Sequence, residues 1–170
     1  MAHEFFADDL EVLNYALTLE HLEAAFYTQV NASGVLTGDA TKYLQIIGEH
    51  ENAHVEALTQ GISQAGGTPV AARQSYNFDA LGDLSTQEGI LGAAKVLEET
   101  GVAAYNGAGS GIRDKGILSV AGGIVQTEAN HAAIIRVLID PNANPVPTAF
   151  PPATAPEEIL AAVTPLLGPE

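Results

Sequence analysis

Two short runs of the chain carry the same pair of chemically active residues. HENAH occupies residues 50–54, TEANH occupies residues 127–131, and both contain Glu-x-x-His: Glu51 with His54, and Glu128 with His131. His-Glu-x-x-His on a helix is a zinc-protease motif, in which both histidines bind the metal. A protease also needs a third ligand downstream and usually a strand that holds extended substrate, and neither is evident. Because the second run keeps only the glutamate and the last histidine, Glu-x-x-His is the unit that repeats.

A second pair of stretches repeats at nearly the same distance. LEHLEAAFY (19–27) and LEETGVAAY (97–105) each place a tyrosine seven residues after a glutamate, as Glu20 with Tyr27 and Glu98 with Tyr105. The offset is 98 − 20 = 78 for this pair and 128 − 51 = 77 for Glu-x-x-His. Two matches at nearly one offset indicate that residues 10–62 and 88–139 are two related helix hairpins.

The spacing of apolar residues predicts the elements that hold these motifs. Apolar side chains recur every three or four positions, which predicts amphipathic helices over roughly residues 8–31, 41–65, 85–108 and 114–139. Residues 66–85 show no helical period and form a long loop, and Ser85-Thr-Gln-Glu88 is a capping-box pattern for the third helix. We therefore expect an all-α four-helix bundle over residues 1–140, with one long crossover between the second and third helices.

The C-terminal segment differs in composition from the bundle. Eight of the nine prolines lie in residues 141–170, which predicts a mostly extended tail. Within this tail, PEEILAAVTPLL (156–167) could form one short helix that docks on the bundle.

Four glutamates and two histidines of the repeats lie on the apolar stripes of their helices: Glu20, Glu51, His54, Glu98, Glu128 and His131. An isolated buried charge costs on the order of tens of kcal/mol before it is neutralised. The nearest basic residues, Lys95 and Arg136, are expected at the edge of this set. Two divalent cations would offset four carboxylates, so the pattern predicts a dinuclear metal site of the kind built from Glu and Glu-x-x-His in helix bundles.

The spacing also predicts a role for each ligand. We expect Glu51 and Glu128 to bridge the metals, Glu20 and Glu98 to bind as terminal carboxylates, and His54 and His131 to give one nitrogen to each metal. Oxygen-rich sites with one imidazole per metal suit iron or manganese, with zinc as a plausible substitute. Such metals could bind dioxygen or peroxide between them.

Five further residues are candidates for the surroundings of the metals: Glu23, Tyr27, His50, Glu99 and Tyr105. The tyrosines could hydrogen-bond the ligands or relay electrons, or be core aromatics with a satisfied hydroxyl. Glu23 lies one turn from Glu20, and His50 lies one turn from His54. Glu99 could approach the metals or pair at the edge with Lys95, four residues earlier.

At these motifs the sequence resembles the ferritin-like superfamily, and more narrowly the ferritin-like family that includes desiccation-related proteins. The shared stretches are LNYALTLEHLEAAFY (13–27), AGGTPV (65–70) with YNF (76–78), LEETGVAAYNGA (97–108), TAFPPA (148–153) and EEILAAVTPLLG (157–168). The resemblance covers nearly the whole chain from about Leu10, and it implies a ferritin-like bundle. The superfamily includes ferroxidases, rubrerythrin-type peroxidases, manganese catalases and oxygenases, and fold alone does not choose among these.

The sequence differs in two features from well-known members of the superfamily. The chain has no cysteine, so it lacks the Cys-x-x-Cys module of full-length rubrerythrin, and its long proline-rich tail differs from cage-forming ferritin. We expect a di-metal protein that reacts with dioxygen or peroxide in oxidative or desiccation stress. The alternative is a stress-associated surface or assembly protein without catalysis, and a homo-oligomer stays open because Gly101, Gly122 and Gly123 could form a close-packing face.

The charge of the chain excludes several partners. Acidic residues outnumber basic ones 21 to 6, and the formal net charge of -15 argues against nucleic acid and anionic membranes. No apolar run reaches the roughly 18 residues that span a membrane. The start, MAHEFFADDL, has neither a basic n-region nor an apolar h-region. We expect no signal peptide in this chain, so the protein is cytoplasmic or is exported with its signal already removed.

Overall fold

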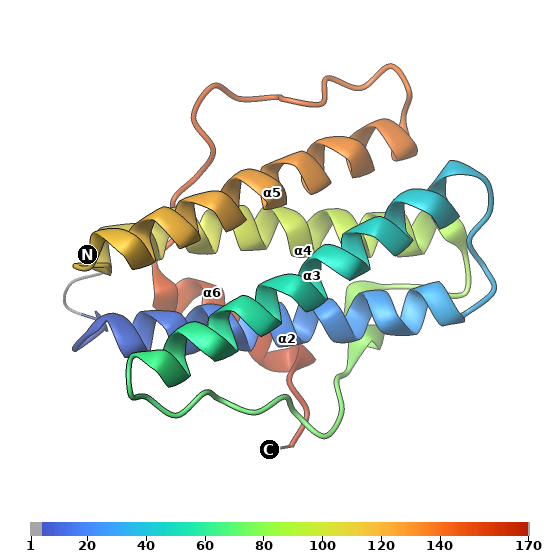
Figure 1. Cartoon of the computed structure of the whole chain (residues 1–170). Helices are drawn as coiled ribbons and strands as arrows, with labels where there is room; N and C mark the ends of the chain where they lie inside the picture. Colours follow the sequence, from blue (N-terminus) through green and yellow to red (C-terminus); the bar gives the residue numbers. More distant parts are fainter. Residues whose placement is uncertain (1–4, 170) are drawn as a thin grey trace.

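The computed structural model describes residues 5–169 and consists mainly of helices (Figure 1). Four long helices form the bundle: α2 (Asp9–Ala32), α3 (Asp39–Gln64), α4 (Gln87–Ala108) and α5 (Lys115–Ile139). α2 packs along α3, and α4 packs along α5, as two helix hairpins. The boundaries differ from the predicted ones by no more than two residues, and the predicted all-α four-helix bundle is confirmed.

Side-chain caps fix the first turns of three of these helices. The Asp8 carboxylate accepts a hydrogen bond from the Glu11 N–H, and Asp114 accepts from the N–H groups of Gly116 and Ile117. α4 begins one residue later than its capping-box pattern predicts. Thr86 is the N-cap and accepts from the Gly89 N–H, while the Ser85 hydroxyl donates to Asp83.

The crossover between α3 and α4 runs along the length of the bundle (Figure 1). It contains a short 3-10 helix, Phe78–Leu81, whose Phe78 ring packs at 5.4 Å from that of Phe26. The end of the chain lies against this crossover, since the Asn77 N–H donates to the Leu166 carbonyl at 2.8 Å. The crossover and the C-terminal segment therefore close one side of the bundle together.

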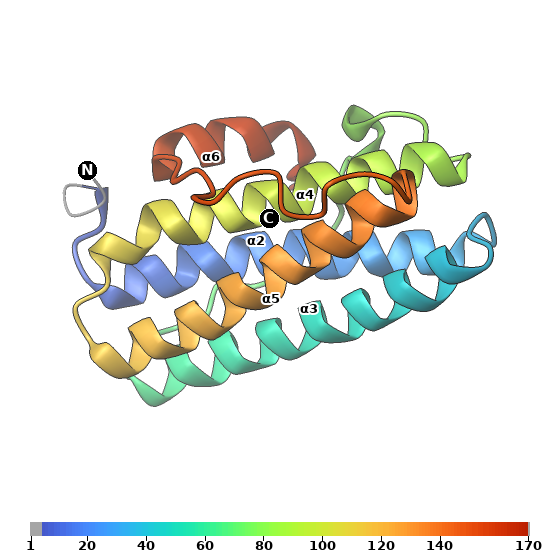
Figure 2. The same ribbon diagram turned by 90° about the horizontal axis from the view of Figure 1, so that it is seen from above.

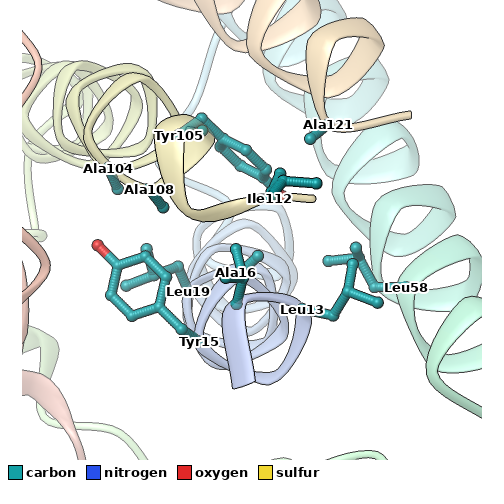
Figure 3. Close-up of a pocket in the computed structure, with 12 residues that line it drawn as sticks. Leu13, Tyr15, Ala16, Leu19, Leu58, Ala104, Tyr105, Ala108, Ile112 and Ala121 are labelled. Carbon is teal, nitrogen blue, oxygen red and sulfur yellow. The ribbon is translucent and has the colours of Figure 1, made fainter. Parts of the chain in front are cut away.

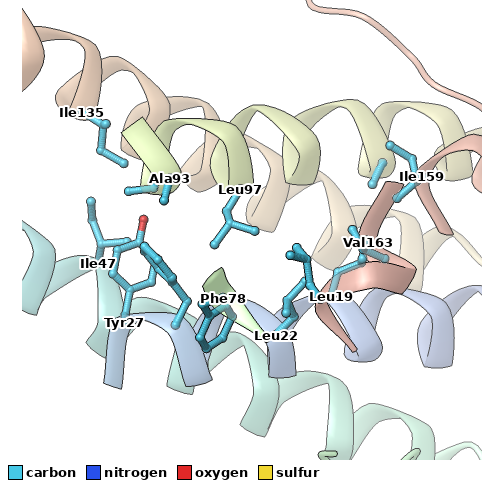
Figure 4. Close-up of a cluster of buried hydrophobic side chains, with 14 of the residues drawn as sticks. Leu19, Leu22, Tyr27, Ile47, Phe78, Ala93, Leu97, Ile135, Ile159 and Val163 are labelled. Atoms are coloured by element: carbon cyan, nitrogen blue, oxygen red, sulfur yellow. The ribbon is translucent and has the colours of Figure 1, made fainter. Parts of the chain in front are cut away.

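The tail forms the helix α6 (Pro156–Val163), which packs against the bundle and is followed by a short 3-10 helix, Thr164–Leu166. Ile159 and Val163 of α6 enter the same core cluster as Leu19 and Leu22 of α2 (Figure 4). Proline at the first position of α6 suits a helix start, where no backbone N–H partner is required. Before α6, residues 140–155 return along the bundle as an extended strap (Figure 2).

Among the helices of residues 5–169, none combines the length and the apolar character needed to cross a lipid bilayer. The expectation that the chain has no signal peptide rests on the stretch MAHEFFADDL (1–10). Residues 1–4 of this stretch lie outside the described residues.

Candidate metal centre

All six predicted ligands lie together in the middle of the bundle, and each long helix contributes at least one of them. Glu20 comes from α2, Glu98 from α4, and the two Glu-x-x-His pairs from α3 and α5. The four glutamates are 0% exposed, and His131 is 2% exposed. Because residues three apart lie on the same helix face, each Glu-x-x-His places its carboxylate and imidazole on the core side together.

Two groups of four ligand atoms are each close enough to surround one cation. Glu20, Glu51, His54 and Glu128 form the first group, and Glu51, Glu98, Glu128 and His131 form the second. Within each group the ligand atoms all lie within 4.8 Å of one another. The groups share Glu51 and Glu128, which are the two residues that the sequence predicts as bridging ligands.

In each group one histidine nitrogen faces the carboxylates. His54 Nδ1 lies 3.1 Å from Glu20 Oε2 and 3.0 Å from Glu51 Oε2. His131 Nδ1 lies 3.0 Å from Glu51 Oε1 and 3.2 Å from Glu98 Oε2. Both imidazoles therefore point the same ring atom into the carboxylate cluster, as two nitrogen ligands of a dinuclear site would.

Burial and mutual repulsion make the carboxylates hard to ionise. Burial raises the pKa of Glu20 to about 8, although the hydrogen bond from His54 acts against this rise. Burial and the charge of Glu98 hold the pKa of Glu128 well above its usual range. Glu51 is the exception, because hydrogen bonds from His131 and His54 outweigh burial and lower its pKa to about 2. Without a cation, burial and repulsion thus favour the protonated, neutral forms of Glu20 and Glu128.

The histidines respond in the opposite sense. Burial disfavours the charged form of His54, but hydrogen bonds to Glu128, Glu20 and Glu51 outweigh it and raise its pKa to about 12. Burial acts likewise on His131, and hydrogen bonds to Glu51 and Glu98 raise its pKa to about 10. The neighbouring carboxylates therefore favour the protonated form of both imidazoles.

The two tyrosines of the repeat hydrogen-bond the terminal carboxylates crosswise. The Tyr27 hydroxyl of α2 donates to Glu98 Oε1 of α4, and the Tyr105 hydroxyl of α4 donates to Glu20 Oε1 of α2, both at 2.5 Å. Each bond leaves the other carboxylate oxygen, Oε2, facing a histidine. The repeat places each tyrosine seven residues after a glutamate of its own helix, and in the fold its hydroxyl reaches the matching glutamate of the other hairpin.

Apolar side chains surround the Tyr105 end of the cluster. Leu13, Ala16, Leu58 and the Tyr105 ring line a small space, shown in Figure 3, with a volume of about 10 Å³. A volume of roughly 10–15 Å³ is needed to hold even one water molecule. This end of the cluster is therefore narrow, and its lining is apolar.

His50 lies beside the second group of ligands. Its Nδ1 atom is 2.9 Å from His131 Nε2, and the two rings stack with their centroids 5.1 Å apart. If His131 Nδ1 bound a cation, its Nε2 would carry the proton and donate to His50 Nδ1. No matching histidine exists in the other half, because the repeat offset of 77 places Thr127 there.

Glu23 is a seventh acidic side chain at the cluster, on the same face of α2 as Glu20. It is 3% exposed, and its Oε2 atom has no hydrogen-bond partner among the described residues. Gly101 makes room for it: a Cβ atom there would lie 3.2 Å from Glu23 Oε1 and 2.9 Å from Glu128 Oε2. The repeat could have revealed this, since Gly101 stands 78 residues after Glu23.

The structure does not bring Glu99, the remaining candidate, into the cluster. Its Oε1 atom accepts hydrogen bonds from the Arg136 guanidinium at 2.9 and 3.1 Å and lies 4.0 Å from Lys95 Nζ. The cause is helical geometry, because one residue after Glu98 the side chain has turned by about 100° around the axis. Glu99 belongs to the outer surface of α4.

The donor set fits two divalent cations. Glu128 Oε2 and Glu23 Oε2 are buried without a hydrogen-bond partner within residues 5–169, and an unsatisfied buried carboxylate is costly. Carboxylate oxygens with one imidazole nitrogen per cation are hard and borderline donors that suit iron, manganese or zinc. The protein thus has a group of buried carboxylate and histidine side chains that could hold metal ions.

The fold and this site together define a ferritin-like bundle. The chain matches the ferritin-like domain family over residues 8–141, and it belongs to that family. No curated protein matches the sequence.

Two solved structures share the fold. A conserved hypothetical protein from Mycobacterium tuberculosis has a TM-score of 0.69 at 18% identity, covering 83% of this chain and 95% of that chain. A hypothetical protein from Methanococcus jannaschii has a TM-score of 0.69 at 14% identity, covering 91% of each chain. At this level of identity the likeness supports the ferritin-like fold.

Proposed function

We propose that this protein is a di-metal carboxylate protein that uses iron or manganese to react with dioxygen or peroxide in oxidative or desiccation stress. One observation carries the proposal: two groups of buried ligand atoms, each within 4.8 Å, share Glu51 and Glu128. Shared carboxylates hold two cations as a pair. When bound there, two redox-active ions would supply the electrons for a reaction with dioxygen or peroxide.

The protein side chains hold and shield this pair. Glu51 and Glu128 would bridge the ions. The coordination of one ion would be completed by Glu20 and His54, and that of the other by Glu98 and His131. Tyr27 and Tyr105 fix the orientation of the terminal carboxylates, as hydrogen-bonding partners of metal ligands do. The narrow apolar packing around Tyr105 limits access from that end, and Glu23 can hold a proton near Glu128.

The test is oxidant consumption by protein loaded with Fe(II) or Mn(II). We expect the loaded protein to consume dioxygen or hydrogen peroxide faster than the same concentration of free metal ion. Glu128→Gln removes a shared ligand and should abolish the difference, whereas Glu99→Gln changes an acidic residue of the outer surface and should keep it. A loaded wild-type protein that reacts no faster than free metal would refute this function.

A role without catalysis is the second candidate, and the tail favours it. Phe150 is 89% exposed and Val146 is 65% exposed, so the strap presents two large apolar side chains to solvent. Such residues could contact a second copy in an assembly. Sedimentation of the wild type and of Phe150→Ser would test this: a metal-independent oligomer that the substitution disperses would favour assembly, and a monomer in both cases would not.

A further inference from the structure

A second cavity lies on the outside of the α4–α5 hairpin, away from the carboxylate cluster. It has a volume of about 310 Å³, with Val102, Ala129 and Ala132 on the helix side and Val146, Pro147 and Pro151 on the strap side. Its lining is predominantly apolar. An engineered apolar cavity of about 150 Å³ binds benzene, so this space is large enough for more than one ring.

The strap that roofs the cavity is fastened on both sides of it. The Pro145 carbonyl accepts from Arg136 Nη1 at 2.9 Å at one end. At the other end Asn106 Nδ2 donates to the Pro152 carbonyl at 3.1 Å, and the Thr154 N–H donates to the Ala103 carbonyl at 3.1 Å. Between these bonds the strap arches over α4 and α5 (Figure 2). Prolines stiffen the arch, so the cavity is held open at low entropic cost.

One glycine permits the strap to lie this close. A Cβ atom at Gly107 would lie only 1.8 Å from the Thr154 carbonyl oxygen. That atom is backbone and cannot turn away as a side chain could. Gly107 therefore fixes the height of the strap above α4, and with it the depth of the cavity.

The polar groups of the cavity carry little net charge. Glu99 and Arg136 form its charged wall, and they neutralise each other through the 2.9 Å ion pair. Asn130 and Thr148 add an amide and a hydroxyl that can form hydrogen bonds. Ligand sites of this kind are mainly apolar with a few polar groups that fix orientation.

We propose that this strap cavity binds a neutral, mainly apolar organic molecule of one or two rings that carries a hydrogen-bonding oxygen. The volume of about 310 Å³ limits the ligand to a molecule of about this size. Charge also limits the class of ligand. The net charge of -15 repels organic anions, and the Arg136 guanidinium, already paired with Glu99, does not offset this repulsion. The proposal does not depend on the metal centre. The cavity and the candidate ligands Glu128 and His131 nevertheless lie on opposite sides of the same turns of α5.

The probe for the test is 2-naphthol, a neutral two-ring phenol, titrated into the full chain and followed by its fluorescence and by calorimetry. We expect one saturable site in the wild type, both with metal and after chelation. Ala129→Leu fills the floor and should weaken binding by at least about tenfold, equivalent to about 1.4 kcal/mol. Ala57→Leu, on the exposed face of α3, is the matched control and should leave binding unchanged.

A second pair of variants tests the strap. Gly107→Ala pushes the strap away and should weaken 2-naphthol binding by at least about fivefold. Gly92→Ala, also inside α4, meets no atom within 4 Å and should leave binding unchanged. Absent or non-saturable binding to the wild type, or equal affinities across both pairs, would overturn the proposal. Binding that survives chelation would uphold it even if the loaded protein failed to consume oxidant.

Discussion

The crosswise tyrosines show how single residues set the candidate site. Each hydroxyl holds one oxygen of a terminal glutamate and directs the other toward a histidine. The bonds join α2 to α4, so each hairpin orients a ligand of the other. Loss of such a hydrogen bond to a metal ligand typically costs about 10- to 100-fold in affinity.

The first prediction follows from these bonds. Tyr105→Phe should lower the affinity for Mn(II) by about 10- to 100-fold, measured by competition with a fluorescent chelator. Tyr15→Phe is the matched control, because the buried Tyr15 hydroxyl has no hydrogen-bond partner within residues 5–169 and its removal costs no bond. Equal affinities for the two variants would show that the Tyr105 bond does not hold Glu20 in place for the metal.

Gly101 supplies a second prediction at the residue scale. In Gly101→Ala the new methyl group would lie 2.9 Å from Glu128 Oε2, so the carboxylate must swing away. Metal affinity should fall, while the chelated protein should keep or gain stability, because Ala favours a helix by about 1 kcal/mol over Gly.

The control for this variant is Gly92→Ala, which has open space. It should gain the same helix stability without loss of metal. Thermal unfolding after chelation, together with metal titration, separates the two effects. A Gly101→Ala variant that binds metal as the wild type does would contradict the close contact with Glu128.

Residue types and spacing predicted which six side chains the bundle brings together. Helical periodicity was sufficient for this, because it fixes which residues face the core. The partners of those residues were harder to predict. The crosswise tyrosine bonds and the space above Gly101 depend on how α4 lies relative to α2, and no pattern within one helix specifies that.

At the scale of elements, α6 connects the tail to the bundle. Ile159 is 4% exposed and joins the core cluster of α2 and α4. Proline content predicted an extended tail, and the amphipathic PEEILAAV stretch predicted its helix. The path of the strap depended on a feature with no periodic pattern, namely the missing Cβ atom of Gly107.

The tail should therefore contribute to the stability of the bundle. Ile159→Ala should lower the free energy of unfolding by about 2–5 kcal/mol, as truncation of a buried Ile does. Leu118→Ala, on the exposed side of α5 at 45% exposure, should change it by less than about 1 kcal/mol. Chemical denaturation measures both, and an Ile159→Ala protein as stable as the wild type would show that α6 does not share the core.

At the scale of the whole molecule, the cluster ties stability to pH. Burial raises the pKa of Glu20 to about 8 from 4.5, and hydrogen bonds outweigh burial to raise that of His131 to about 10 from 6.5. Both groups bind protons more tightly when folded. Their contributions are complete below the unfolded pKa and are lost as pH rises through the folded pKa. Glu51, with its pKa lowered to about 2, loses its contribution only below about pH 4.5.

After chelation, the protein should thus unfold at a lower temperature at about pH 9 than at about pH 6. Metal binding requires ionised carboxylates and neutral imidazoles, so the stabilisation by Mn(II) should grow over the same range. Calorimetry at constant ionic strength, with and without chelator, gives both trends. A melting temperature of the chelated protein that stays level or rises from pH 6 to 9 would contradict the stated proton uptake.

The most direct test of the central claim is the number of metal ions that each chain holds. Protein loaded with Mn(II), desalted and analysed by mass spectrometry of the metal should contain about two ions per chain. Glu51→Gln should reduce this to less than about one, because Glu51 belongs to both ligand groups. Glu99→Gln should retain about two. A wild type with less than about one ion per chain, or Glu51→Gln with as many as the wild type, would contradict a dinuclear site bridged by Glu51 and Glu128.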